Sequence, residues 1–82
     1  MIKSEILLKN NISYFLSLAI QELRSYGYST ERLNKAKEGV YKTIDKIYNQ
    51  NPNYSDFEVE LKSYIASVDD AVYVLERELI HF

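Results

Sequence analysis

Cysteine and tryptophan are absent from this 82-residue sequence, and its only histidine is His81. Without cysteine the chain has no disulfide framework, no thiolate nucleophile and no cysteine-based zinc site, so a reducing cytoplasm is the expected location. Only two glycines and one proline are present. Since these residues interrupt regular structure, their scarcity favours long helices joined by short turns.

The sequence also lacks long apolar runs. No segment approaches the roughly 20 apolar residues that a membrane-spanning helix needs, and the first residues lack the continuous apolar run of a signal peptide. Hydrophobic residues at 46% and charged residues at 27% are typical of an ordinary globular chain. A chain of this length is expected to form one domain, residues 1–82, and its net charge of −2 gives no general attraction to nucleic acid.

Apolar residues recur at helical spacing in three segments, 4–26, 30–49 and 55–80. Gly27 can take the left-handed conformation that ends a helix, and Pro52 removes the preceding residue from helical geometry. The sequence therefore predicts an all-α fold, an up-down-up three-helix bundle with short turns, which can dimerise into a larger helical bundle.

The third segment has the most regular pattern. Six apolar residues follow one another at alternating spacings of four and three: Leu61, Ile65, Val68, Val72, Leu75 and Leu79. Such a heptad seam keeps its side chains on one face of a helix. We therefore expect one unbroken helix, covered by the first two helices or by a second copy.

Residues suited to catalysis or to metal binding are scarce. His81 lies next to the carboxyl end, where fraying prevents accurate positioning. Asp69 and Asp70 are adjacent and would point about 100° apart on a helix. Gly27 and Gly39 are isolated, so no phosphate-binding loop exists. We predict no enzymatic activity, no catalytic or metal-binding residue and no cofactor.

Charges of opposite sign are concentrated in different segments. Residues 30–50 contain five basic and three acidic residues, whereas residues 51–82 contain two basic and seven acidic residues. One explanation is that the second and third helices are neighbours whose flanks attract one another. The other is recognition of phosphates by a basic side of the second helix, formed by Arg32, Lys35, Lys42 and Lys46.

Two helices carry apolar residues on a second side. On the first helix these are Leu7, Tyr14 and Leu18, and on the third helix Val59, Ala66, Tyr73 and Ile80 recur every seven residues. Single exposed aliphatic residues are normal, but helices that are apolar on two sides are also typical of partner surfaces. The predicted partner-binding residues are Leu7, Tyr14, Leu18, Asp70, Tyr73, Glu76 and Ile80.

These observations favour a small non-enzymatic helical protein that acts by protein–protein interaction, with a protein partner or a second copy in a homodimer. Inhibitors, immunity-type proteins and phage or plasmid regulatory proteins share this general character. A composition rich in Asn, Tyr, Lys and Ile is typical of AT-rich bacterial or phage genomes. The alternative is a nucleic-acid-binding regulator that uses the basic side of the second helix, although few basic residues and a pI of about 5.3 make nucleic acid the less favoured partner.

Overall fold

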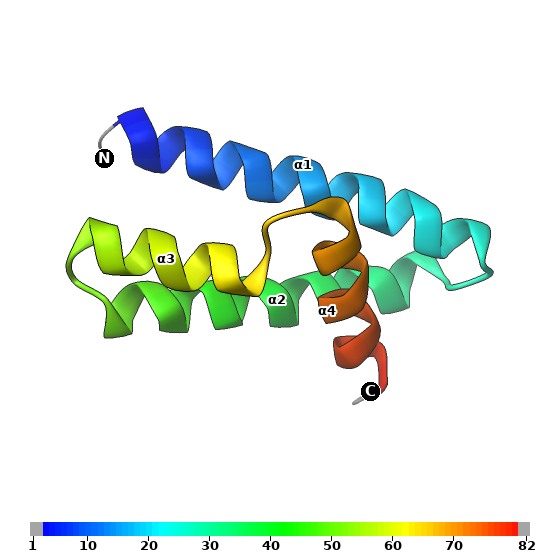
Figure 1. Ribbon diagram of the computed structural model, residues 1–82. Coiled ribbons are helices and arrows are strands. Elements are labelled where there is room, and N and C mark those ends of the chain that lie inside the picture. Colours follow the sequence, from blue (N-terminus) through cyan, green and yellow to red (C-terminus); the bar gives the residue numbers. More distant parts are fainter. Residues whose placement is uncertain (1–2, 81–82) are drawn as a thin grey trace.

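The computed structural model describes the backbone of residues 3–80 and the side chains of residues 8–80. That part of the chain contains four α-helices: α1 (Lys3–Ser25), α2 (Thr30–Gln50), α3 (Tyr54–Tyr64) and α4 (Val68–Ile80). The helices α1 and α2 run antiparallel, α3 returns along α2, and α4 crosses them steeply (Figure 1). The predicted all-α class is confirmed. The predicted single third helix over residues 55–80 is wrong, because this segment forms two helices that point in different directions.

The turn between α1 and α2 is a Schellman motif built around Gly27. Gly27 has φ +102°, a conformation that side chains with a Cβ rarely adopt. Its N–H donates to the carbonyl of Arg24, and the N–H of Tyr28 donates to the carbonyl of Leu23. These bonds satisfy carbonyl groups at the end of α1. The predicted end of the first helix is therefore confirmed.

Side-chain caps begin the next two helices. Ser29 is the N-cap of α2, and its hydroxyl accepts from the N–H of Arg32 at 3.2 Å. Asn53 is the N-cap of α3, and its side-chain oxygen accepts from the N–H of Ser55 at 2.9 Å. Both caps occupy backbone N–H groups that have no partner within the helix.

The chain leaves helical geometry between α3 and α4. Ile65 ends α3 in an extended conformation, with φ −139° and ψ 109°. Two hydrogen bonds then begin α4: the N–H of Asp70 donates to the Ser67 hydroxyl at 3.2 Å, and the N–H of Ala66 donates to Asp70 Oδ2 at 2.9 Å. This arrangement resembles a capping box, except that the Asp70 carboxylate caps the N–H of Ala66 and not that of Ser67. It separates α3 from α4 without a glycine or a proline.

The break changes which residues are buried. Leu61, Ile65, Leu75 and Leu79 are buried as the heptad seam predicts, but Val68 and Val72 are only half-buried. In α4 the residues Ala71 and Val74, which lie off the predicted seam, are buried instead. The seam prediction is therefore confirmed at Leu75 and Leu79 and wrong at Val68 and Val72, because α4 is rotated so that Ala71 and Val74 also face the core.

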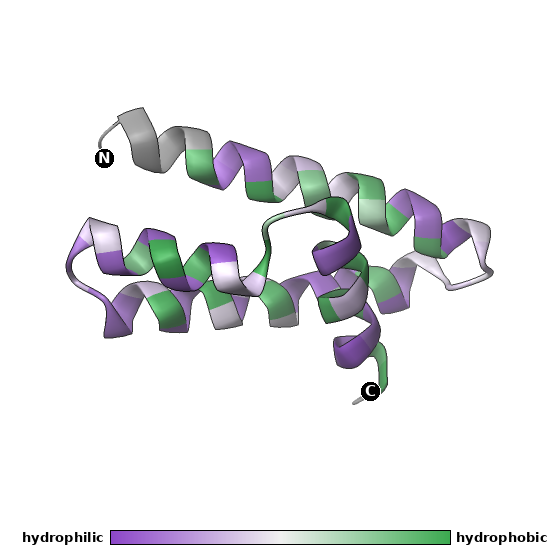
Figure 2. Cartoon of the chain, viewed as in Figure 1, coloured by the Kyte–Doolittle hydropathy of each residue, from purple (hydrophilic) through white to green (hydrophobic). Residues whose placement is uncertain are grey.

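All four helices contribute to one cluster of buried side chains. Its largest fully buried members are Leu16 and Leu23 from α1, Leu33 and Val40 from α2, Phe57 and Leu61 from α3, Ile65, and Leu75 from α4. Each such side chain stabilises the fold by about 1.5–3 kcal/mol relative to exposure. Hydrophobic and hydrophilic residues alternate around each helix (Figure 2), so the outer sides are largely polar. The exceptions are exposed apolar and aromatic residues, among them Tyr14, Val59, Tyr73 and Ile80.

Candidate functional site

The outer face of α4 carries exposed apolar side chains between carboxylates. We call Asp69, Tyr73, Glu76 and Ile80 the α4 surface; all four are exposed, Tyr73 by 61% and Ile80 by 79%. Tyr73 and Ile80 are seven residues apart, which is two helical turns and about 10.5 Å. The Arg77 guanidinium lies over the Tyr73 ring, 5.8 Å from its centroid. This face can therefore offer an aromatic and aliphatic ridge with acidic groups beside it.

Asp70 was predicted as a partner-binding residue, but the structure gives it a different role. It is half-buried, and its carboxylate accepts from the backbone N–H of Ala66 at the start of α4. On the helix it lies about 80° from Ile80 and about 120° from Glu76, at the border between the outer face and the buried face. Asp70 therefore holds the turn between α3 and α4, whereas the other predicted α4 residues, Tyr73, Glu76 and Ile80, share the outer face.

The predicted contact residues of α1 differ in exposure. Tyr14 is 61% exposed, with its ring centroid 6.3 Å from that of Phe15, and Leu18 is half-buried. The side chain of Leu7 lies outside the described residues. Because α1 packs against α4, the two predicted contact groups belong to neighbouring helices. Tyr14 remains available to a partner, while Leu18 offers only part of its surface.

The basic side of α2 is exposed and lies close to α4. Arg32, Lys35, Lys42 and Lys46 are all exposed, as the nucleic-acid alternative requires. Arg32 Nη2 donates to the carbonyl of Leu79 at 3.5 Å. Lys35 and Lys42 line a hollow of about 460 Å³ together with Glu38 and Glu78. These acidic groups reduce the positive potential that a phosphate would experience.

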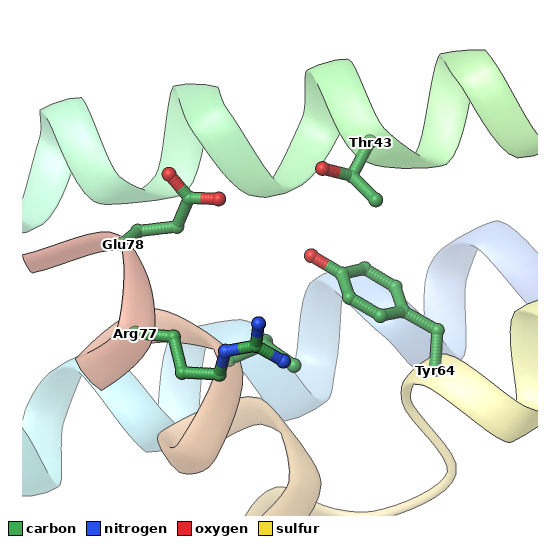
Figure 3. Close-up of a pocket in the computed structure, with 5 residues that line it drawn as sticks. Thr43, Tyr64, Arg77 and Glu78 are labelled. Atoms are coloured by element: carbon green, nitrogen blue, oxygen red, sulfur yellow. The ribbon is translucent and has the colours of Figure 1, made fainter. Parts of the chain in front are cut away.

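A small cleft between α2, α3 and α4 contains residues that the sequence analysis did not select. Thr43, Tyr64, Val74, Arg77 and Glu78 line a volume of about 270 Å³ (Figure 3). The Tyr64 hydroxyl points toward Thr43 (Figure 3). The Thr43 hydroxyl donates to the carbonyl of Gly39 at 3.2 Å. Pockets for small ligands are usually larger, about 300 Å³ or more.

Electrostatics in this cleft involve the phenol of Tyr64. Burial raises the pKa of Tyr64, and the nearby Glu78 carboxylate raises it further, while the Thr43 hydroxyl and Arg77 act in the opposite direction. Tyr64 is half-buried, so the neutral phenol is the form that the cleft favours. No pattern in the sequence could have identified this group, because its members are brought together only by the fold.

Gly39 of α2 lies beside the Glu78 side chain of α4. A Cβ at this position would overlap the carboxylate of Glu78. The glycine therefore leaves room for the Glu78 side chain beside the α2 backbone. This close approach places a carboxylate of α4 against the basic side of α2, which supports the explanation that the segregated charges serve contacts within the chain.

Within residues 8–80, no group of three or more histidine, cysteine or acidic residues is arranged to hold a metal ion. None of the helices in the described part of the chain has the length and hydrophobicity to cross a membrane. A comparison with protein-family models and searches of curated proteins and of solved structures find no match for the chain. The proposals below therefore rest on the geometry of the exposed faces.

Proposed function

We propose that this protein is a non-enzymatic helical docking protein that binds another protein through the α4 surface. The observation that carries the proposal is the exposure of Tyr73 and Ile80 on the outer face of a helix whose other side buries Ala71, Val74, Leu75 and Leu79 in the core. Tyrosine provides a large contact area at a low entropic cost and is enriched in protein interfaces. An inhibitor, an immunity-type protein or a regulatory protein would all act through such a contact.

The charges of the α4 surface define the chemistry of the partner. Asp69 and Glu76 are exposed on the same side of Tyr73 and are seven residues apart. A partner with an apolar hollow and basic groups at its rim would bury Tyr73 and Ile80 and pair with these carboxylates. Such complementarity mainly increases specificity and the rate of association. A second copy is a poor occupant of this face, because a two-fold contact would bring four carboxylates together with only two cations, the Arg77 of each copy.

The proposal is tested with Tyr73→Asp and Ile80→Asp combined in one variant. The wild type immobilised on a resin should retain a specific protein from an extract of the source cells, and the double variant should lose it. Val59→Asp is the matched control, since Val59 is also an exposed apolar residue, at 66%, but lies on α3. Retention by the double variant, or no specific retention by the wild type, would contradict the proposal.

Nucleic-acid binding is the second candidate function, and the exposure of Arg32, Lys35, Lys42 and Lys46 supports it. Neutralised phosphates release counterions, so binding should weaken steeply as salt rises. A gel-retardation series in increasing salt, with Lys42→Glu as the variant, tests this function. Absence of retardation at low salt would remove it.

A further inference from the structure

The outer face of α1 has no charged residue over three helical turns. From Asn10 to Gln21 the sequence contains neither an acidic nor a basic residue. Asn10, Tyr14, Ser17 and Gln21 are all exposed and lie on the side of α1 opposite its buried residues. We call these four residues the neutral face of α1. Figure 1 shows that the other three helices lie on the opposite side of α1.

Charge distinguishes the neutral face from the other exposed helix faces. The α4 surface contains two carboxylates, and the basic side of α2 contains four cationic side chains. In a two-fold dimer each surface meets its own copy, so charges of one sign on a single face repel one another. The neutral face avoids this repulsion. The nearest charges on α1 are the exposed Lys9, Glu22 and Arg24 at the ends of this stretch. On one edge Lys62 lines a hollow beside Asn11 and Phe15, and charges are normal at the rim of an interface.

We propose that a second copy of this chain docks antiparallel along the neutral face of α1. This inference rests on the proposed protein–protein function, but it uses a different helix and a different partner. Suppose that the two-fold axis crosses the neutral face at the level of residue 16 along α1. Tyr14 of one copy then lies opposite Leu18 of the other copy, and the same pair forms again on the other side of the axis. Tyr14 and Leu18 are four residues apart and belong to the same flank of the helix. In an antiparallel two-fold pair, each flank of α1 faces the same flank of α1 in the other copy.

The size of this contact predicts a weak dimer. Twelve helical residues are about 18 Å long. One helix pair of this length buries less than the roughly 800 Å² per partner of a standard stable interface. The polar residues Asn10, Ser17 and Gln21 can form hydrogen bonds across the contact, but they contribute little apolar area. The dimer should therefore be measured at protein concentrations that approach about 1 mM.

Substitutions of Ser17 by charges of either sign test the identity of the occupant. Ser17 is exposed, lies one residue from the proposed axis and makes no described side-chain hydrogen bond. In Ser17→Glu and in Ser17→Lys, each copy places its charge close to the same charge on the other copy. Either variant should weaken self-association by about tenfold or more. An equal mixture of the two variants should recover it, because opposite charges then meet.

Sedimentation equilibrium of the full chain provides the measurement, with 9.6 kDa as the mass of one copy. Ser63→Glu and Ser63→Lys are the matched controls, since Ser63 is exposed on α3, and both should associate like the wild type. Circular dichroism checks that each variant is folded. The proposal is overturned if the wild type remains monomeric, if either Ser17 variant dimerises like the wild type, or if the mixture remains monomeric. These outcomes are independent of binding at the α4 surface, which the Tyr73 and Ile80 variant tests.

Discussion

The turn between α1 and α2 and the turn between α3 and α4 end their helices in different ways. The first depends on the positive φ of Gly27, which only a residue without a Cβ adopts at little cost. The second contains Ile65, Ala66 and Ser67, none of which is a strong helix breaker. It is formed by two caps, the Ser67 hydroxyl on the Asp70 N–H and the Asp70 carboxylate on the Ala66 N–H, and by the burial of α4.

This difference separates a local cause from a distant one. A glycine at the end of an apolar pattern is sufficient to predict a turn. The second turn replaces hydrogen bonds of a continuous helix with side-chain caps, and it becomes favourable when α4 packs across α1 and α2. Substitutions on the two sides of each turn test this comparison.

The largest effect is expected from shortening valines on the two sides of α4. Val74 is 6% exposed, while Val72, on the heptad seam, is half-buried. Val74→Ala should reduce the free energy of unfolding by about 2 kcal/mol, since two buried methyl groups are lost and a cavity remains. Val72→Ala should reduce the free energy of unfolding by a smaller amount. Urea denaturation measures both, and a larger loss in Val72→Ala would favour one continuous helix.

Gly27→Ala should destabilise the protein by about 1–2 kcal/mol, the cost of a left-handed residue with a Cβ. Apart from Gly27 and its two neighbours in the chain, no described atom lies within 4 Å of the position that this Cβ would occupy, so the cost comes from the backbone conformation. Gly27→Asn is the control and should be better tolerated, because asparagine adopts this conformation more readily. Thermal denaturation of both variants measures the effect; equal stability of Gly27→Ala and wild type would show that the turn does not need glycine.

Asp70→Ala should cost about 1 kcal/mol, because the N–H of Ala66 loses its acceptor. The neighbouring Asp69 is exposed and also lies in the first turn of α4, so Asp69→Ala controls for the interaction of a negative charge with the helix dipole. The difference between the two variants in urea denaturation isolates the cap. Equal losses would mean that charge alone, and not capping, stabilises the start of α4.

The smallest effect concerns pH and Tyr64, whose pKa is raised mainly by burial. A raised pKa means that the folded state retains its proton at a pH where the unfolded state has lost it. Stability should therefore decrease as pH rises from about 10, the ordinary tyrosine value. Tyr64→Phe should weaken this alkaline decrease, and denaturation at pH 8 and at pH 10.5 measures it. An identical decrease in the variant would assign the pH dependence to other groups.

Much of the candidate contact surface could be inferred from sequence spacing. Tyr73 and Ile80 are exposed on one face of α4, as their separation by seven residues predicts, because this short separation stays within a single straight helix. Asp70 was assigned to the same group, although its spacing from Ser67 matches the capping pattern that begins α4. That spacing is visible in the sequence, but the heptad seam running through it predicts one continuous helix.

The sequence by itself determined that the chain is helical and where α1 ends, since these features depend on contacts between residues a few positions apart. Only the tertiary structure decided the direction of α4. In a continuous helix Tyr64 and Glu78 would be about 21 Å apart, yet they line the same cleft. The pattern of apolar residues is compatible with one helix or with two. The burial of Ala71 and Val74 against the other helices selects two, because it depends on many contacts between residues that are distant in the sequence.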